Sequence, residues 1–237
     1  MAEYYSDAEQ AERLKALAKT YGGSVVTGIL LALSAYFGWV WWQNKQTADR
    51  FVQASQFQQV ADAAQAAQAA PEDQAARSKF LSQAHALTKT SPDSIYSVQT
   101  LLLEARLASE RNDYASAVKA LQQASQAKLD DPGLQQLITL RLARAQQEQG
   151  QSDAALASVA RVTDAAFLAS AQELKGDILL SKKDPRGAQA AYQQAWAALV
   201  KRQEPRQTIK FKLESLGVEV KDIDVPSPVK TAQEPGA

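Results

Sequence analysis

Cysteine is absent from the sequence, and histidine occurs once, as His85. A chain without thiols cannot form disulfides, use a cysteine nucleophile or hold a metal through sulfur. A single histidine also excludes metal motifs that need two histidines on one chain. The sequence contains no G-x-S-x-G nucleophile motif and neither of the common glycine-rich phosphate loops. We therefore predict that the protein is not an enzyme and uses no cofactor and no metal.

An excess of charge of either sign is also missing, because 26 Lys and Arg residues balance 26 Asp and Glu residues. Domains that bind nucleic acids normally carry a basic surplus, so this balance predicts no nucleic-acid partner. Aromatic residues make up only 7% of the chain. Alanine and glutamine are abundant instead, and both lose little side-chain freedom in a helix. The composition therefore favours an all-α fold.

Charged residues are missing altogether from residues 22–42, which read GGSVVTGILLALSAYFGWVWW. A helix of this length extends roughly 30 Å, about the thickness of a bilayer core. Aromatic residues gather at the C-terminal end of the segment, and such rings prefer the headgroup level of a membrane: Tyr36, Phe37, Trp39, Trp41 and Trp42. We predict a single transmembrane helix here, with a buried core helix as the alternative.

The flanks of this segment predict how it is oriented. Acidic residues precede it and no small-residue cleavage site follows it, which disfavours a cleaved signal peptide. Three basic residues come before it and two after it: Arg13, Lys15 and Lys19, then Lys45 and Arg50. The positive-inside rule then predicts that residues 1–21 are cytoplasmic and that the C-terminal part is exported.

Small residues recur every four positions within the predicted membrane helix, at Ser24, Gly28 and Ala32. This spacing places them on one helix face, and small residues allow close approach of a second helix in a membrane. We predict this face as a candidate contact with a partner membrane helix. The alternative is the ordinary tolerance of membrane helices for small residues.

A helical stalk is predicted over residues 43–70, which contain neither proline nor glycine. Phe57, Val60, Ala64 and Ala67 fall at helical spacing, so this stalk is expected to pack on another element. Pro71 ends it. At the other end of the chain the helical periodicity stops, and residues 217–237, which contain proline and glycine, are predicted to form a disordered tail.

Residues 71–216 carry an internal repeat. Small residues twelve positions apart recur three times, with a turn inside each pair: Ala105 and Ala117 around 112–113, Ala143 and Ala155 around 150–151, Gly176 and Ala188 around 183–184. A larger residue follows four positions later, as Leu121, Val159 or Tyr192. Antiparallel helices cross closely only where both carry small side chains, and the larger residue fills the adjoining groove. The spacing predicts a tetratricopeptide-like solenoid; coincidence in an alanine-rich chain is the alternative.

A solenoid of helix pairs presents an extended concave surface to its partners. The residue after the first small residue of each pair should face that surface. This rule predicts Arg106, Arg144 and Asp177 as partner contacts. A second charged cluster consists of Lys201, Arg202, Arg206, Lys210 and Lys212. It is interpreted either as a contact with anionic membrane lipid or as a solvated helix face.

Four segments of the sequence resemble one known family. They are AERLKALAKTYGGSVVTGILLALSAYFGW from Ala11, LITLRLARAQQEQGQSDAAL from Leu137, ELKGDILLSKKDPRGAQAAYQQAW from Glu173 and IKFKLESLG from Ile209. The family is that of the YfgM-like ancillary subunits of the SecYEG translocon, and the resemblance covers residues 3 to 217.

The resemblance implies a non-enzymatic adaptor in the inner membrane of Gram-negative bacteria, with its repeat domain in the periplasm. Its partners would be the SecYEG translocon, the membrane-anchored periplasmic chaperone PpiD and exported client proteins, which it would help to pass to periplasmic chaperones. Two other readings remain. One is an envelope scaffold or assembly factor whose repeats organise another membrane complex, and the other is a membrane-bound hydrolase with an unrecognised carboxylate site.

Overall fold

The computed structural model describes residues 7–224, but the side chains of 7–10, 13–14, 17–18, 20, 22 and 24–25 lie outside the description. The chain divides into two units, Met1–Ser55 and Gln56–Ala237. Every regular element in the described part is an α-helix. The predicted all-α class is therefore confirmed.

The first unit contains most of helix α1, which runs Asp7–Ala69. Its large apolar side chains are exposed to an unusual degree, Leu31 at 67% and Trp41 at 65%. Among the described residues, no helix holds an apolar stretch long enough to cross a membrane. The predicted anchor is thus not found there; its residues Gly22, Ser24 and Val25 have side chains that lie outside the description.

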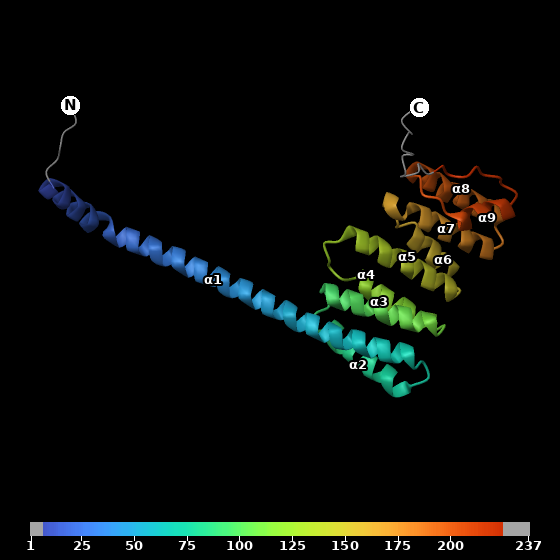
Figure 1. Ribbon diagram of the computed structural model, residues 1–237, viewed down its shortest axis with the longest axis horizontal. Coiled ribbons are helices and arrows are strands. Elements are labelled where there is room, and N and C mark those ends of the chain that lie inside the picture. The colour runs from blue at the N-terminus through green and yellow to red at the C-terminus, as the bar shows by residue number, and fades with distance from the viewer. Residues whose placement is uncertain (1–6, 225–237) are drawn as a thin grey trace, which may run out of the picture. The chain divides into compact units, whose positions relative to one another are not determined.

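The second unit is a stack of helix pairs (Figure 1). The end of α1 is followed by α2, Gln74–Thr90, and two-helix units then follow along the chain. They are α3 (Ile95–Glu110) with α4 (Tyr114–Ser125), α5 (Pro132–Glu148) with α6 (Ser152–Val159), and α7 (Ala165–Ser181) with α8 (Pro185–Arg202). Helix α9, Gln207–Ser215, packs on α8. This arrangement confirms the predicted tetratricopeptide-like repeats.

Aspartate marks the start of most helices in this unit. The carboxylates of Asp73, Asp113, Asp131, Asp164 and Asp184 each accept a hydrogen bond from a backbone N–H in the first turn that follows. These N–H groups have no partner within the helix, so a capping carboxylate stabilises the helix end, typically by about 1 kcal/mol. The sequence thereby specifies where each helix begins.

One type of turn joins the helices in three successive pairs. Asn112, Gly150 and Lys183 have positive φ angles of 59°, 82° and 63°. The residue after each donates its N–H to the carbonyl five positions earlier, at 2.9, 2.8 and 2.9 Å. That bond is typical of a helix end closed by a left-handed residue. The predicted turn positions are therefore correct, and two of the three left-handed residues are not glycine.

The small residues of the repeat lie at helix crossings, as predicted. Ala117, Ala143, Ala155 and Ala188 are all 0% exposed. A Cβ atom added to Gly176 would lie 2.3 Å from the Tyr192 ring, closer than any real contact. The helices of a pair therefore approach as closely as they do because these positions carry little or no side chain.

The predicted stalk differs from the structure in its second half. Val60 and Ala64 are buried against Phe80, and Phe57 and Ala67 pack against the same cluster. The predicted packing of this stripe is therefore confirmed, but residues 56–69 belong to the repeat unit and not to a separate stalk. The repeat pattern in the sequence did not reveal the pairing of the α1 end with α2. The connection between these helices, residues 70–73, is one residue longer than the three turns described above.

The beginning of the predicted disordered tail also differs. Val218, Val220 and Ile223 pack against the hydrophobic cluster of α8 and α9. Apolar residues at alternate positions suit an extended segment lying on a helical surface, a pattern that helical periodicity does not detect. The tail prediction at 217 is therefore too early, and residues 225–237 lie outside the description.

The helix crossings yield the first test. Replacing Ala155 with Leu inserts a larger side chain at a fully buried crossing, and we expect a loss of roughly 1–3 kcal/mol. The matched control is Ala157→Leu, which makes the same change at an exposed position of the same helix. Thermal unfolding followed by circular dichroism should show a clearly lower midpoint for A155L only. Equal midpoints for the two variants would contradict the assignment of the crossing.

Candidate functional site

Two of the three predicted partner contacts, Arg106 and Arg144, line the same cavity. It has a volume of about 370 Å³ and is lined by residues of α3, α4 and α5. We call it the α3–α5 groove. The two arginines come from equivalent places in successive repeats, which is why the stacking of α3 beside α5 brings them together.

Charge in the α3–α5 groove is mostly positive. A third arginine, Arg141, lines it beside Arg106 and Arg144, against a single carboxylate, Glu148. Arg106 also contacts Glu110, with Nε 2.8 Å from Oε1, but these side chains are 61% and 39% exposed. Within the described part of the chain, no carboxylate oxygen lies within 4.0 Å of Arg141 or Arg144. The groove therefore offers guanidinium groups to a partner.

Apolar side chains form the rest of this surface. Leu102, Ala105, Leu121 and Ala145 line the groove, and the last three are 5% exposed or less. The cavity is at the small end of the roughly 300–1,000 Å³ typical of ligand sites. The arrangement can hold one apolar group next to an anionic one.

Arg141 was missed by the sequence reasoning, which took only the residue next to each small residue. The signal was present in the LRLAR motif, where Arg141 and Arg144 lie three positions apart. Residues at this spacing share one face of a helix. Applying helical spacing to Arg144 would have added Arg141 to the site.

Asp177, the third predicted contact, does not lie in the groove. Its carboxylate accepts hydrogen bonds from the Tyr192 hydroxyl at 2.7 Å and the Lys212 ammonium at 2.7 Å. Burial raises the pKa of Tyr192, and the hydrogen bond to Asp177 raises it further. Burial alone would lower the pKa of Lys212, but its bonds to Asp177 and Glu173 outweigh this and raise it. Asp177 therefore connects α7, α8 and α9.

The basic cluster near the C-terminus is also engaged internally. Arg206 and Lys212 both contact Glu173, at 3.3 and 2.9 Å. Arg202 contacts Glu204 at 2.9 Å and Lys210 contacts Asp222 at 2.6 Å. These ion pairs compensate much of the charge that suggested a lipid contact.

The predicted membrane-helix contact falls in α1. Gly28 and Ala32 are exposed, and the side chain of Ser24 lies outside the described residues. A Cβ atom added to Gly28 would have no neighbour within 4 Å. This face is thus open to a second helix at Gly28.

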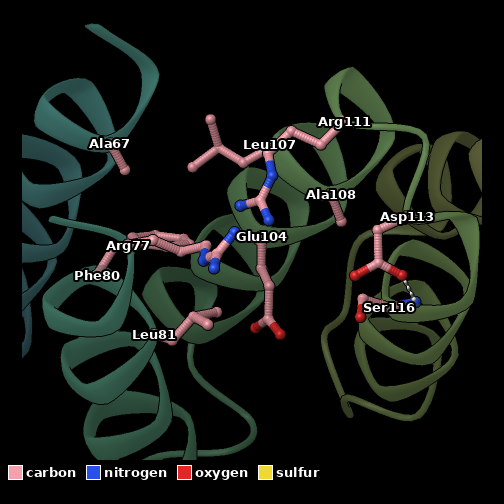
Figure 2. Close-up of a pocket in the computed structure, with 10 residues that line it drawn as sticks. All are labelled: Ala67, Arg77, Phe80, Leu81, Glu104, Leu107, Ala108, Arg111, Asp113 and Ser116. Atoms are coloured by element: carbon pink, nitrogen blue, oxygen red, sulfur yellow. Dashed lines mark hydrogen bonds between the residues drawn. The ribbon is translucent and has the colours of Figure 1, made fainter. Parts of the chain in front are cut away.

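A second cavity, of about 350 Å³, is lined by α2, α3, the end of α1 and the start of α4 (Figure 2). Figure 2 shows the Arg77 and Arg111 side chains extending into the space between α2 and α3, and the Glu104 carboxylate directed away from both. Two arginines and two acids line this cavity, since Asp113 also belongs to its lining. The lining therefore carries equal numbers of positive and negative side chains, which makes this cavity the weaker candidate.

Two carboxyl groups of this second cavity have shifted pKa values of opposite sign. Hydrogen bonds from Ser116 lower the pKa of Asp113, and the nearby Arg111 and Arg77 act in the same direction. Burial raises the pKa of Glu104, and the charges of Lys119 and His85 only partly offset this. Asp113 is thus a structural cap of α4, whereas the surroundings of Glu104 disfavour the charged form of its carboxyl group.

Stacked helix pairs define the protein as a helical-repeat protein. The family model of the tetratricopeptide repeat-like domain matches residues 15–218. The chain therefore belongs to the tetratricopeptide repeat-like family, in the group that contains the proteins named ancillary SecYEG translocon subunit.

Several bacterial relatives bear that name, and three of them are described here. The protein from Haemophilus influenzae is 30% identical over 195 residues, covering 82% of this chain and 91% of the relative. That from Aggregatibacter actinomycetemcomitans is 32% identical, covering 72% of this chain and 79% of the relative. That from Escherichia coli is 28% identical, covering 81% and 88%. No solved structure matches the chain significantly.

Glu104 provides a test that depends on pH. The pKa of Glu104 in the folded protein lies above the ordinary value of 4.5. Protonation of Glu104 therefore stabilises the fold. This stabilisation is fully present below the ordinary pKa and is lost as the pH rises through the folded pKa. At pH 7 the negative charge on this partly buried carboxylate is destabilising, so Glu104→Gln should raise the unfolding midpoint. The gain should shrink towards pH 4, where Glu104 is itself largely neutral.

The matched control is Glu148→Gln, at an exposed carboxylate of α5. Thermal unfolding of both variants and the parent at pH 4, 5.5 and 7 measures the effect. A gain for E104Q that does not vary with pH would contradict the assignment of burial as its cause.

Proposed function

We propose that this protein is a non-enzymatic, membrane-anchored adaptor that associates with the SecYEG translocon. The observation that carries the proposal is family membership over most of the chain, with relatives that are named ancillary SecYEG translocon subunits. The helical-repeat scaffold supports it, because such scaffolds bind proteins through extended surfaces. The α3–α5 groove supplies a surface of this kind.

The anchor in this proposal is the segment 22–42, in the inner membrane. It has no charged residue over its whole length, including the positions whose side chains are not described. Ten of its large side chains are more than 45% exposed, a state that favours contact with a bilayer: Val26, Ile29, Leu30, Leu31, Leu33, Tyr36, Phe37, Trp39, Trp41 and Trp42. The basic flank bias supports a cytoplasmic N-terminus and a periplasmic repeat domain.

The repeat domain in this proposal hands newly exported chains to periplasmic chaperones, with PpiD as the membrane-anchored partner. Confinement to the bilayer supports such a role physically. Two linked contacts act at high effective concentration, so each can be weak and still exchange clients rapidly. The membrane-helix face at Gly28 would supply one contact, and the α3–α5 groove the other.

Topology is the first test of this proposal. Protease added to spheroplasts should digest the chain from residue 43 onward, because we place that part in the periplasm. A known periplasmic domain and a known cytoplasmic protein serve as the digested and protected controls. Protection of the repeat domain while the periplasmic control is cut would reverse the proposed orientation.

The contact inside the membrane is the second test. The double variant Gly28→Leu, Ala32→Leu fills the small-residue face, and we expect it to reduce co-purification with SecYEG severalfold. The control, Thr27→Leu with Ser34→Leu, enlarges small residues on other faces of the same helix. Equal recovery of SecYEG with both variants would mean that the helix provides confinement only. Absence of SecYEG from purifications of the parent chain would favour an envelope scaffold instead.

A further inference from the structure

The α3–α5 groove combines a positive rim with an apolar floor, and this combination restricts what can occupy it. We propose that it binds an acidic protein segment in which carboxylates flank one apolar side chain. This rests on the proposed function, in which the repeat domain engages partner proteins, and it names the chemistry of that contact.

The acidic part of the occupant follows from the guanidinium groups. Arg106 on α3 and Arg141 and Arg144 on α5 line the groove from two helices, against Glu148 alone. Guanidinium groups match carboxylates in a planar, two-bond geometry. The pair between Arg106 and Glu110 is exposed, and such pairs contribute little, so Arg106 can exchange its partner. A segment carrying two or more carboxylates would therefore contact both helices at once.

The apolar part follows from the residues beneath. Ala105 and Ala145 are small and buried, so the space between α3 and α5 remains open above them. Leu102 and Leu121 line this space. A fully hydrated ion, such as a lone phosphate, would gain nothing from that floor. A leucine or phenylalanine side chain would cover the apolar floor, and both apolar surfaces would then be removed from water.

The contrast with the second cavity supports this assignment. There two arginines, Arg77 and Arg111, share the lining with two acids, Glu104 and Asp113, and the arginines help to lower the pKa of Asp113. The α3–α5 groove instead has three cations for one acid, and two of them lack an acidic partner among the described residues. The groove therefore has positive charge available for a partner, whereas the second cavity has as many acids as arginines.

The test uses the full chain in micelles of an uncharged detergent and a fluorescent peptide in which two glutamates flank a single leucine on each side. Fluorescence anisotropy should show saturable binding that weakens as salt is added. Arg141→Ala with Arg144→Ala should weaken binding about tenfold, since two charged contacts are lost. The single variant Arg144→Lys should bind the peptide more tightly than Arg144→Ala does but less tightly than the parent. Lysine keeps the positive charge but lacks the planar guanidinium group that bonds a carboxylate at two points.

The matched control is Arg186→Ala, which removes an arginine of α8 that is also exposed and does not line the groove; peptide binding by this variant should be unchanged. Ser109→Leu fills the groove without changing charge and should also weaken binding. A peptide with glutamine for every glutamate, and one with glycine for leucine, should each bind at least about fivefold more weakly. Circular dichroism melting confirms that each variant is folded.

Three results would overturn the proposal. They are equal binding of the glutamine peptide, equal effects of the R141A/R144A and R186A variants, or displacement of the peptide by phosphatidylglycerol in the micelle at concentrations where a zwitterionic lipid has no effect. The last would make an anionic lipid the occupant. Co-purification of SecYEG with the parent chain is measured separately. Peptide binding without SecYEG would refute the proposed function alone, and SecYEG without peptide binding would refute this inference alone.

Discussion

The close approach of paired helices depends on side chains that are nearly absent where the helices cross. Gly176 is the extreme case, since a Cβ atom there would lie 2.3 Å from the Tyr192 ring. Interiors are densely packed, so such a contact cannot be relieved by small movements of its neighbours. The large residue beside the crossing, such as Tyr192 or Leu121, then fills the space that a tight crossing leaves. The close spacing of the two helices within each pair follows from this packing.

The α3–α5 groove is a consequence of the same packing. Small buried residues such as Ala105, which lies at a helix crossing, and Ala145 also leave the surface above them hollow. Charged residues cannot enter the crossing, so they lie along the rim of the hollow. Arg106 and Arg144 reach one cavity because α3 and α5 begin equivalent repeats. A scaffold requirement thus generates a surface on which polar side chains can vary at little cost in stability.

The C-terminal end of the stack shows how charge is used when the purpose is structural. Lys212 bridges Glu173 and Asp177 at 2.9 and 2.7 Å, and Tyr192 donates to the same Asp177. The terminal helix of a solenoid has no following repeat to cover it. Helix α9 and the segment containing Val218 and Val220 cover α8 instead. Charges near this end are therefore paired, in contrast to those of the groove.

Local patterns in the sequence determined the helices, their caps, the three short turns and the small residues at the crossings. Each of these depends on spacing within about 15 residues, which a chain displays directly. Pairing of the α1 end with α2, the ordered segment after Gly217 and the ion pairs of Asp177 were decided only by the tertiary structure. They join residues whose partners are distant or whose connections are irregular; Asp177 and Lys212, for example, are 35 positions apart. A sequence shows which residues are able to ionise or to pack. Only the stacked helices decide that Arg144 and Arg106 line one groove, whereas Asp177 pairs with Lys212.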